Sequence, residues 1–260
     1  MKKSILLSTA LLACLTLFAG CQQTKSNEEV SVRTIEKKLT AGANDVNYTV
    51  DFPEGKNAAL NTVIAEYISQ NMGGDYNGDY ANGDSLVNFY AKKALKELAE
   101  IHGDIEDEMT YTNDMTIQKT YETDRIVTFE IQTYEFTGGA HGLGMTYGVT
   151  FRKSDGQQVN MNVLPNNIVE NEKWKKLMKE GLKEYFEVKT DQELEECIDV
   201  DVNDLPLPET EVHFNEKGLV MTYQSYEIAC YAAGQPSLVI PYSKLEPYMN
   251  TTGKSLFYEK

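Results

Sequence analysis

The chain has 260 residues, with 24 lysine and arginine residues against 40 aspartate and glutamate residues, so its formal net charge is −16. Nucleic acids and anionic lipid headgroups bind basic surfaces, and the composition therefore argues against both as partners. The length is sufficient for one large domain or for two smaller lobes.

The first 20 residues have the pattern of a secretory signal: two lysines, an apolar run over 5–18 and the sequence LFAGC at 17–21. The run is shorter than the about 20 residues that a spanning helix needs. Small residues before Cys21 predict lipoprotein processing, so Cys21 would carry lipid and anchor the chain to a membrane. A plain cleaved signal with an incidental cysteine is the alternative. The polar residues that follow predict a tether over 21–45.

Residues 46–160 are predicted to form an α+β region. Alternating β-branched and aromatic residues predict a strand over 46–52, and helical apolar spacing predicts a helix over 57–70. A second helix is expected from Asp84, as its N-cap, to near Gly103. Three more strands are expected over 109–120, 125–136 and 145–152, followed by a tight turn at Asp155-Gly156. The inward stripe expected for the second helix comprises Leu86, Phe89, Tyr90, Ala94, Leu98 and Ile101.

Residues 161–260 are predicted to form a second α+β region. An amphipathic helix is expected over 171–188 with Trp174 facing inward, and Gly181 should weaken this helix slightly. Strands are expected on both sides of a turn at 215–218 and at 237–242, and a short helix from Ser243. Because strands cluster and helices are segregated, the predicted fold class is α+β, with antiparallel sheet or sheets and helices packed on one side. A soft boundary falls near residue 160, and two lobes sharing one sheet is an alternative.

The sequence lacks the patterns that accompany metal or nucleophilic catalysis. His102, His141 and His213 are scattered, without the paired spacing that holds zinc on one element. The loop 73–84 has the acidic spacing of a calcium loop but lacks its glycine and its bidentate glutamate. Neither a nucleophile elbow nor a phosphate-binding Gly-Lys motif occurs. No metal and no cofactor is therefore expected.

The stretch EFTGGAHGLG, residues 135–144, ends a predicted strand in glycines that surround one histidine. Gly138 and Gly139 can adopt positive φ, as a bulge or a sharp turn requires. Gly142 keeps the flank of the loop thin, so that other backbone can approach it closely. His141 then has two interpretations: it hydrogen-bonds the carbonyl of a neighbouring loop, or it is a contact residue in a binding surface.

Two cysteines and two glutamates are the remaining candidate groups. In an oxidising compartment Cys197 and Cys230 are predicted to form a disulfide, with two separate buried thiols as the alternative. Glu135 and Glu227 could form the carboxylate pair that glycoside hydrolysis requires, and an envelope glycan hydrolase is therefore a rival function. Strand glutamates that face water are the commoner case.

Two motifs together resemble a known family. TGGAHG at 137–142 and YEIACYAAGQPSLVIPYSKL at 226–245 are similar to the DUF3298 domain, preceded by a DUF4163 (PdaC-like) region over 46–160. This family is similar to the extracytoplasmic domain of a lysozyme-sensing anti-sigma factor and to the noncatalytic portion of a peptidoglycan deacetylase. Cys230 stands where the family often has proline. The His-x-x-x-His ligands of that deacetylase are missing, so the resemblance implies the shared module without its catalysis.

The sequence therefore predicts a lipid-anchored binding module of the cell envelope, facing the periplasm or in the outer membrane. The resemblance implies that the partner is a peptidoglycan fragment or a glycan-acting protein such as lysozyme, and tyrosine-bearing loops suit such contacts. Membrane contact is expected only through the lipid. A structural envelope lipoprotein without a small ligand is a further alternative. The expected contact residues are Gly138, Gly139, His141, Gly142, Tyr226, Glu227, Tyr231 and Gly234.

Overall fold

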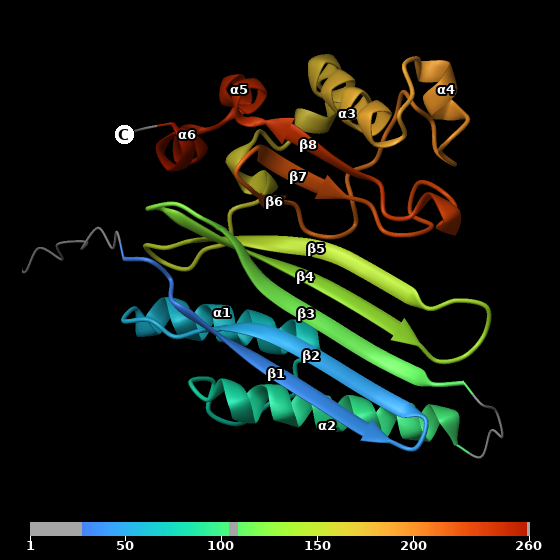
Figure 1. The fold of residues 1–260 in the computed structure, drawn as a ribbon. Helices are drawn as coiled ribbons and strands as arrows, with labels where there is room; N and C mark the ends of the chain where they lie inside the picture. The colour runs from blue at the N-terminus through green and yellow to red at the C-terminus, as the bar shows by residue number, and fades with distance from the viewer. Residues whose placement is uncertain (1–27, 104–108, 259–260) are drawn as a thin grey trace, which may run out of the picture.

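A computed structural model describes residues 28–103 and 109–258. The predicted signal, Cys21 and the first part of the predicted tether lie outside these ranges. The described chain forms two separate sheets, one of five strands in the order β1-β2-β3-β4-β5 and one of three strands in the order β6-β7-β8 (Figure 1). Within the described ranges no helix combines the length and the apolar character needed to cross a bilayer.

The five-stranded sheet and the two helices between its strands form the first lobe. Neighbouring strands are antiparallel except β2 and β3, which are parallel because the chain crosses between them through two helices and not through a hairpin. The predicted α+β class is confirmed, and the parallel pair is the departure from the antiparallel expectation. The elements of this lobe are β1 (Val32–Ala41), β2 (Asn44–Pro53), α1 (Ala58–Met72), α2 (Gly83–His102), β3 (Tyr111–Glu122), β4 (Ile126–Phe136) and β5 (Leu143–Arg152).

β1 occupies part of the stretch predicted as a tether, so that prediction is wrong for residues 32–41. β1 is an edge strand that pairs only with β2, and Ile35 is its one buried residue. The other positions are exposed or half-exposed, so the sequence shows no clear apolar alternation. Charged side chains such as Lys37 and Lys38 along this edge disfavour pairing with a second chain.

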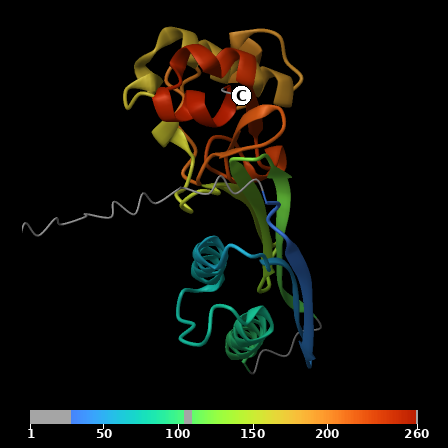
Figure 2. The same cartoon turned by 90° about the vertical axis from the view of Figure 1, so that its left-hand side faces the viewer.

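Both α1 and α2 cover the same face of the five-stranded sheet, as predicted (Figures 1 and 2). Alternate residues of β2, among them Val46 and Val50, are buried beneath the helices, and the residues between them are half-exposed. Gly83, the first residue of α2, lies so close to the sheet that a Cβ atom there would come within 2.5 Å of the Phe52 ring. The absence of a side chain therefore allows α2 to begin directly against β2.

Two details of α2 differ from the prediction. The N-cap is Asn82, whose side chain accepts a hydrogen bond from the Ser85 N–H, and Asp84 already lies inside the helix. Phe89 and Ile101 were expected in the inward stripe but are 36% and 50% exposed. Since 3.6 residues make a turn, the buried stripe of a long helix drifts around its axis, and Ile101 at the far end rotates away from the sheet.

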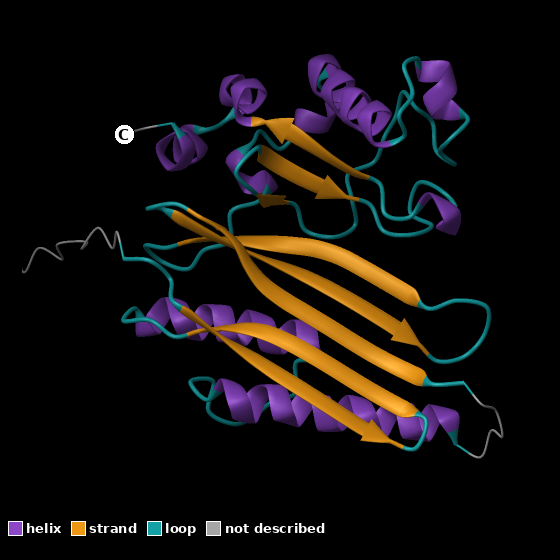
Figure 3. Cartoon of the chain, viewed as in Figure 1, coloured by secondary structure: helices purple, strands orange, loops and turns teal. Residues whose placement is uncertain are grey.

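The second lobe packs several helices over the three-stranded sheet, as Figure 3 shows. The predicted amphipathic helix is present, with Trp174, Met178 and Leu182 fully buried. A Cβ atom on Gly181 would come within 2.7 Å of Leu238, so the glycine that weakens the helix also lets it approach the sheet closely. The elements are α3 (Glu172–Tyr185), α4 (Asp191–Glu195), β6 (His213–Phe214), β7 (Gly218–Thr222), β8 (Ser237–Pro241), α5 (Tyr242–Leu245) and α6 (Thr251–Phe257), with short 3-10 turns at Met161–Val163, Ile168–Glu170, Tyr231–Ala233 and Glu246–Tyr248.

The lobes have separate sheets and separate hydrophobic cores, and a polar junction joins them. The Thr128 hydroxyl on β4 donates to the Phe214 carbonyl on β6 at 2.7 Å. The Phe214 N–H donates to the Thr150 hydroxyl on β5 at 2.9 Å. The lobes therefore do not share one sheet, and the junction places the loops of the second lobe along β5.

Candidate binding site

The two sequence motifs meet in space at the β4–β5 hairpin. The ring of Tyr231 stacks on the imidazole of His141, with ring centres 3.8 Å apart and planes 17° from parallel. The hydroxyl of Tyr226 lies 3.3 Å from His141 Nε2, and its ring centre is 5.7 Å from that of Tyr231. We call His141, Tyr226 and Tyr231 the aromatic cluster. Residues 85 or more positions apart thus form one surface, as the sequence analysis expected.

The glycines shape the hairpin as their sequence context predicts. Gly138 and Gly139 have φ values of +94° and +90°, in the region that residues with a Cβ atom rarely adopt. Gly142 is buried, and a Cβ atom there would come within 2.5 Å of the Tyr134 ring. The thin backbone at Gly142 therefore lets Tyr134 and Tyr231 approach the hairpin together.

The hydrogen bonds of His141 define its tautomer. Its Nδ1 lies 3.1 Å from the carbonyl oxygen of Gly142, which can only accept, so Nδ1–H donates. Nε2 of the neutral ring then accepts from the Tyr226 hydroxyl. The residue is nevertheless exposed to solvent. The carbonyl that fixes the ring belongs to the next residue of the same loop and not to a neighbouring loop, and the role of His141 as a contact residue stays a prediction.

Tyr226 combines exposure with a constrained backbone. Its side chain is 61% exposed, the most of the large apolar and aromatic residues at the described surface. Its φ is +72°, a conformation that is unfavourable for a residue with a Cβ atom. Neighbouring contacts must therefore offset this cost in free energy. The adjacent Glu227 provides such contacts, because its carboxylate accepts the N–H groups of Gln224 and Glu209, both at 2.7 Å.

Side chains of the second motif also cover the outer edge of β5. The carbonyl oxygens of Gly142, Gly144 and Thr146 accept hydrogen bonds from Tyr231, Gln235 and Gln224 at 2.9, 2.8 and 2.9 Å. The N–H of Thr146 donates to Gln224 Oε1 at 3.1 Å, so the glutamine amide pairs with the strand as a neighbouring peptide would. We call these three side chains the edge clasp. They satisfy an edge that would otherwise be open to another chain.

The comparisons with known proteins agree with this division of the chain. Residues 160–243 match the family described as "Protein of unknown function (DUF3298)", and residues 35–144 match the family described as "Deacetylase PdaC". The chain carries a DUF3298 domain behind a PdaC-like region. The aromatic cluster and the edge clasp are contacts between these two parts, since His141 and Gly142 belong to the PdaC-like match and Tyr226, Tyr231 and Gln235 to the DUF3298 match.

Two crystal structures of DUF3298 family proteins share the fold. The structure from Bacteroides fragilis is 18% identical in sequence, covers 89% of this chain and 97% of its own, and gives a TM-score of 0.74. The structure from Pseudomonas aeruginosa is 15% identical, covers 86% of this chain and 96% of its own, and gives a TM-score of 0.60. At these identities the likeness concerns the fold alone. None of the curated proteins matches the chain.

Glu227 and Gly234 have structural roles in the DUF3298 domain, and their role as contact residues stays a prediction. Both oxygens of Glu227 accept backbone N–H groups, so the carboxylate anchors two loops. Gly234, at φ +74°, ends the 3-10 turn Tyr231–Ala233 by donating its N–H to the Tyr231 carbonyl.

The predicted disulfide is absent. Cys197 and Cys230 are free thiols; Cys230 is exposed, and Cys197 is half-buried with its Sγ–H donating to the Glu193 carbonyl at 3.3 Å. The Cys197 thiol is thus directed back along α4 toward its own preceding turn, which is where a short helix leaves an unpaired carbonyl. Within the described ranges, no group of three or more histidine, cysteine, aspartate or glutamate residues is arranged to hold a metal ion.

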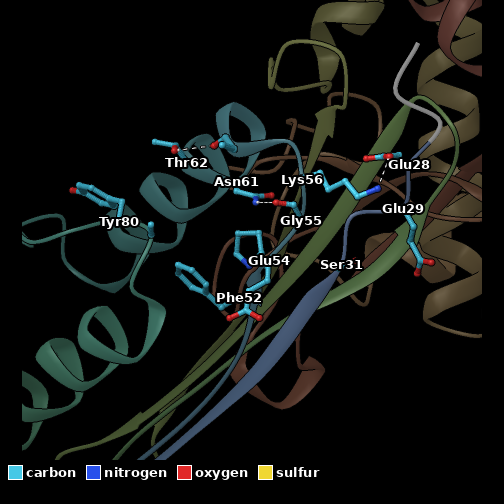
Figure 4. A pocket seen from close by; sticks show the side chains of 13 residues that line it. Glu28, Glu29, Ser31, Phe52, Glu54, Gly55, Lys56, Asn61, Thr62 and Tyr80 are labelled. Carbon is cyan, nitrogen blue, oxygen red and sulfur yellow. Dashed lines mark hydrogen bonds and ion pairs between the residues drawn. The ribbon is translucent and has the colours of Figure 1, made fainter. Parts of the chain in front are cut away.

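A cavity of about 630 Å³ lies at the opposite end of the five-stranded sheet from the aromatic cluster, between the start of α1 and the starts of β1 and α2. Figure 4 shows Phe52 and Asn61 at this cavity and Lys56 directed toward Glu28. Its charged side chains are paired: Lys56 with Glu28 at 3.1 Å, Glu54 with Arg33 at 2.6 Å, and Glu29 with Lys119 at 3.4 Å. The cavity therefore offers no unpaired charge to a ligand, and its side chains do not indicate which class of ligand it would bind.

Proposed function

We propose that this DUF3298 protein is a lipid-anchored binding module of the cell envelope that recognises cell-wall glycan through the aromatic cluster. Lipid on Cys21 would hold the chain at a membrane, and the folded part would begin directly after a short polar tether. The lipoprotein signal in the sequence supports this location.

The observation that carries the proposal is the exposed ring of Tyr226 beside a stacked imidazole and a second tyrosine. Sugar rings have an apolar face of C–H groups and an equatorial rim of hydroxyls, and an amphipathic aromatic surface matches both. The hydroxyl oxygens of Tyr226 and Tyr231 each donate once and keep lone pairs that can accept from sugar hydroxyls.

The cluster is also fixed before any ligand binds. His141 is hydrogen-bonded at both ring nitrogens, and the loop beneath Tyr226 is anchored by Glu227. Little side-chain entropy is then lost on association, and this improves the affinity for ligands such as glycans, whose individual contacts are weak. A constrained φ at an exposed aromatic residue is the kind of strain that accompanies binding sites.

The Tyr226→Ala variant tests the proposal against soluble peptidoglycan fragments, with binding measured by calorimetry. We expect affinity to fall by about tenfold or more, the usual effect of truncating an aromatic anchor. Phe89→Ala is the matched control, because Phe89 is also an exposed aromatic residue but lies on α2. Both variants should unfold at the same temperature as the parent chain within a few degrees.

Unchanged affinity in Tyr226→Ala would remove the aromatic cluster from glycan recognition. A basic glycan-acting protein such as lysozyme is the second ligand for the same experiment, because the net charge of −16 favours a cationic partner. If the chain binds lysozyme only at low salt and does not bind the fragments, the partner would be the glycan-acting protein and not the glycan.

A further inference from the structure

The helix layer leaves part of the sheet uncovered. With 15 residues, α1 is about 22 Å long, whereas the 11 residues of β4 extend about 37 Å. α1 ends above Tyr147, whose hydroxyl donates to Asn71 Oδ1 at 2.9 Å. Beyond that point on the same face of β5, Met145 and Leu143 are 36% and 50% exposed. The shortness of α1 thus opens a crevice between the sheet and the side of α2.

The crevice has a volume of about 320 Å³ and a polar floor. This is near the lower end of the range for small-molecule sites, which is enough for one or two sugar-sized rings. Met72, Met115 and Met145 add apolar, adaptable surface around it. The polar residues that line it include Tyr48, Asn113, Asp114, Glu135 and Tyr147 from the sheet and Lys93 and Glu97 from α2.

Hydrogen bonds across three adjacent strands hold the floor in place. The Tyr48 hydroxyl on β2 donates to Asn113 Oδ1 on β3 at 2.9 Å. Asn113 Nδ2 in turn donates to Glu135 Oε2 on β4 at 3.3 Å, and the two residues are direct cross-strand partners. These two hydrogen bonds hold the Glu135 carboxylate at the crevice through one oxygen and leave its second oxygen available to a ligand.

The crevice carries unmatched negative charge. Lys93 is neutralised by Asp75, whose carboxylate lies 2.6 Å from its ammonium group. Among the described residues, no lysine, arginine or histidine forms an ion pair with Glu97 or Glu135. Burial first, and then the charges of Glu97, Glu135 and Asp114, raise the pKa of the Tyr48 hydroxyl.

We propose that the crevice binds one ring of an amino sugar, with its ammonium group between Glu97 and Glu135 and its hydroxyls on Asn113, Tyr48 and Tyr147. Carboxylates select the cation, the amide and phenol groups select hydroxyls, and the methionines cover the C–H face. The choice of a sugar rests on the proposed glycan-binding function. The crevice is a second site, on the helix side of the hairpin that carries the aromatic cluster.

The test compares a glucosamine trisaccharide with its N-acetylated counterpart by calorimetry, on the full chain at about pH 6, where amino groups are protonated. The two probes have the same rings and differ in the ammonium charge. We expect the glucosamine form to bind about fivefold more tightly, the effect of two exposed carboxylates. Glu97→Gln with Glu135→Gln should abolish this preference.

Two controls separate the crevice from the general acidity of the chain. Glu66→Gln with Glu195→Gln removes the same charge from exposed positions elsewhere and should preserve the preference. A linear diamine has the cation without the ring and should bind more weakly than the glucosamine form. Asn113→Ala should release Glu135 and reduce the preference without removing a charge.

The outcomes distinguish the crevice from the aromatic cluster. Equal binding of both trisaccharides that is lost in Tyr226→Ala would overturn the crevice proposal and leave the proposed function standing. A preference that survives in the Glu97 and Glu135 double variant would also overturn it. Absence of binding by either trisaccharide would overturn the crevice proposal, whereas the proposed function is decided separately by the binding of peptidoglycan fragments.

Discussion

Glu122 at the end of β3 joins the start of the folded chain to the sheet. Its carboxylate accepts the N–H of Val30 at 2.8 Å, the ammonium group of Lys153 at 2.6 Å and that of Lys119 at 3.0 Å. Lys153 is only 3% exposed, so this carboxylate is the partner of a buried ammonium group. Burial opposes ionisation of Glu122, but the hydrogen bonds from Lys153, Val30 and Lys119 outweigh it and lower the pKa of this carboxyl.

Glu122→Gln is expected to reduce the free energy of unfolding by about 3 kcal/mol, because it leaves a buried ammonium group without its counter-charge. Urea unfolding measures the effect. Glu172→Gln is the control: its side chain is 86% exposed and its ion pair with Lys175 is long, so the change should stay within about 0.5 kcal/mol. A loss for Glu122→Gln no larger than that of the control would contradict the anchoring role.

The same carboxylate predicts a pH dependence. Its folded pKa is lower than its unfolded value of about 4.3, so the contribution is fully present above that value and is lost as the pH falls through the folded pKa. The parent chain should therefore lose stability more steeply than Glu122→Gln below about pH 4. Parallel acid limbs in the two stability curves would show that Glu122 does not titrate as described.

Among the elements, β5 has the most unusual surroundings. Its inner edge pairs with β4 in a regular antiparallel ladder, and its outer edge pairs with side chains of the edge clasp. Gln224 supplies both a donor and an acceptor to Thr146, and it also accepts from Gln235 at 3.0 Å. An open edge of the first lobe is thereby used to hold the DUF3298 domain beside the hairpin.

Gln224→Ala is expected to cost about 1–2 kcal/mol of stability, because it leaves the half-buried N–H and C=O of Thr146 without partners. Hydrogen exchange of the Thr146 amide should become faster, while amides of β2 keep their rates. Gln192→Ala, at an exposed position of α4, serves as the matched control. If exchange at Thr146 is the same in both variants, the clasp does not protect this edge.

The whole molecule consists of two cores linked by a polar junction. At that junction the imidazole of His213 lies on Gly148 of β5, and its Nε2 is 3.3 Å from Glu130 of β4. A Cβ atom on Gly148 would come within 2.6 Å of the imidazole ring. The closeness of the lobes therefore depends on one residue without a side chain, since neither sheet continues into the other.

Gly148→Ala is expected to displace His213, to cost about 1–3 kcal/mol and to separate the unfolding of the two lobes. In scanning calorimetry, the unfolding transitions of the two lobes should lie further apart in temperature for this variant than for the parent chain. Gly55→Ala is the control, because a Cβ atom there meets nothing closer than 3.6 Å. An unchanged calorimetric profile for Gly148→Ala would mean that the junction tolerates a wider gap.

Most helices and strands follow from local patterns. Periodicity alone predicts α3 and β2, because the spacing of their apolar residues matches the face that is buried. In α3 these residues are Trp174, Met178 and Leu182, and in β2 they are alternate positions. The sequence does not predict β1, because an edge strand with one buried side chain shows no apolar alternation. The disulfide was predicted from cysteine number and compartment, and neither determines where a thiol points.

Part of the site was also predictable. Gly138 and Gly139 have the positive φ that their context indicated, and the loops around His141 and Tyr231, both expected to carry contact residues, lie side by side. The anchoring role of Glu227 could not be predicted, because its two partners are backbone N–H groups that carry no sequence signal. The crevice arises from a difference in length between a helix and a strand, and no motif encodes it.

By itself the sequence determined most of the element types, the α+β class, the acidic charge and the glycine-rich hairpin, since each depends on residues close along the chain. The tertiary structure alone decided that Gln224 and Gln235 cover an edge, that Glu97 and Glu135 face one volume, and that Lys153 is buried against Glu122. Such contacts join residues tens of positions apart. Their distances follow from packing and register, which local periodicity does not record.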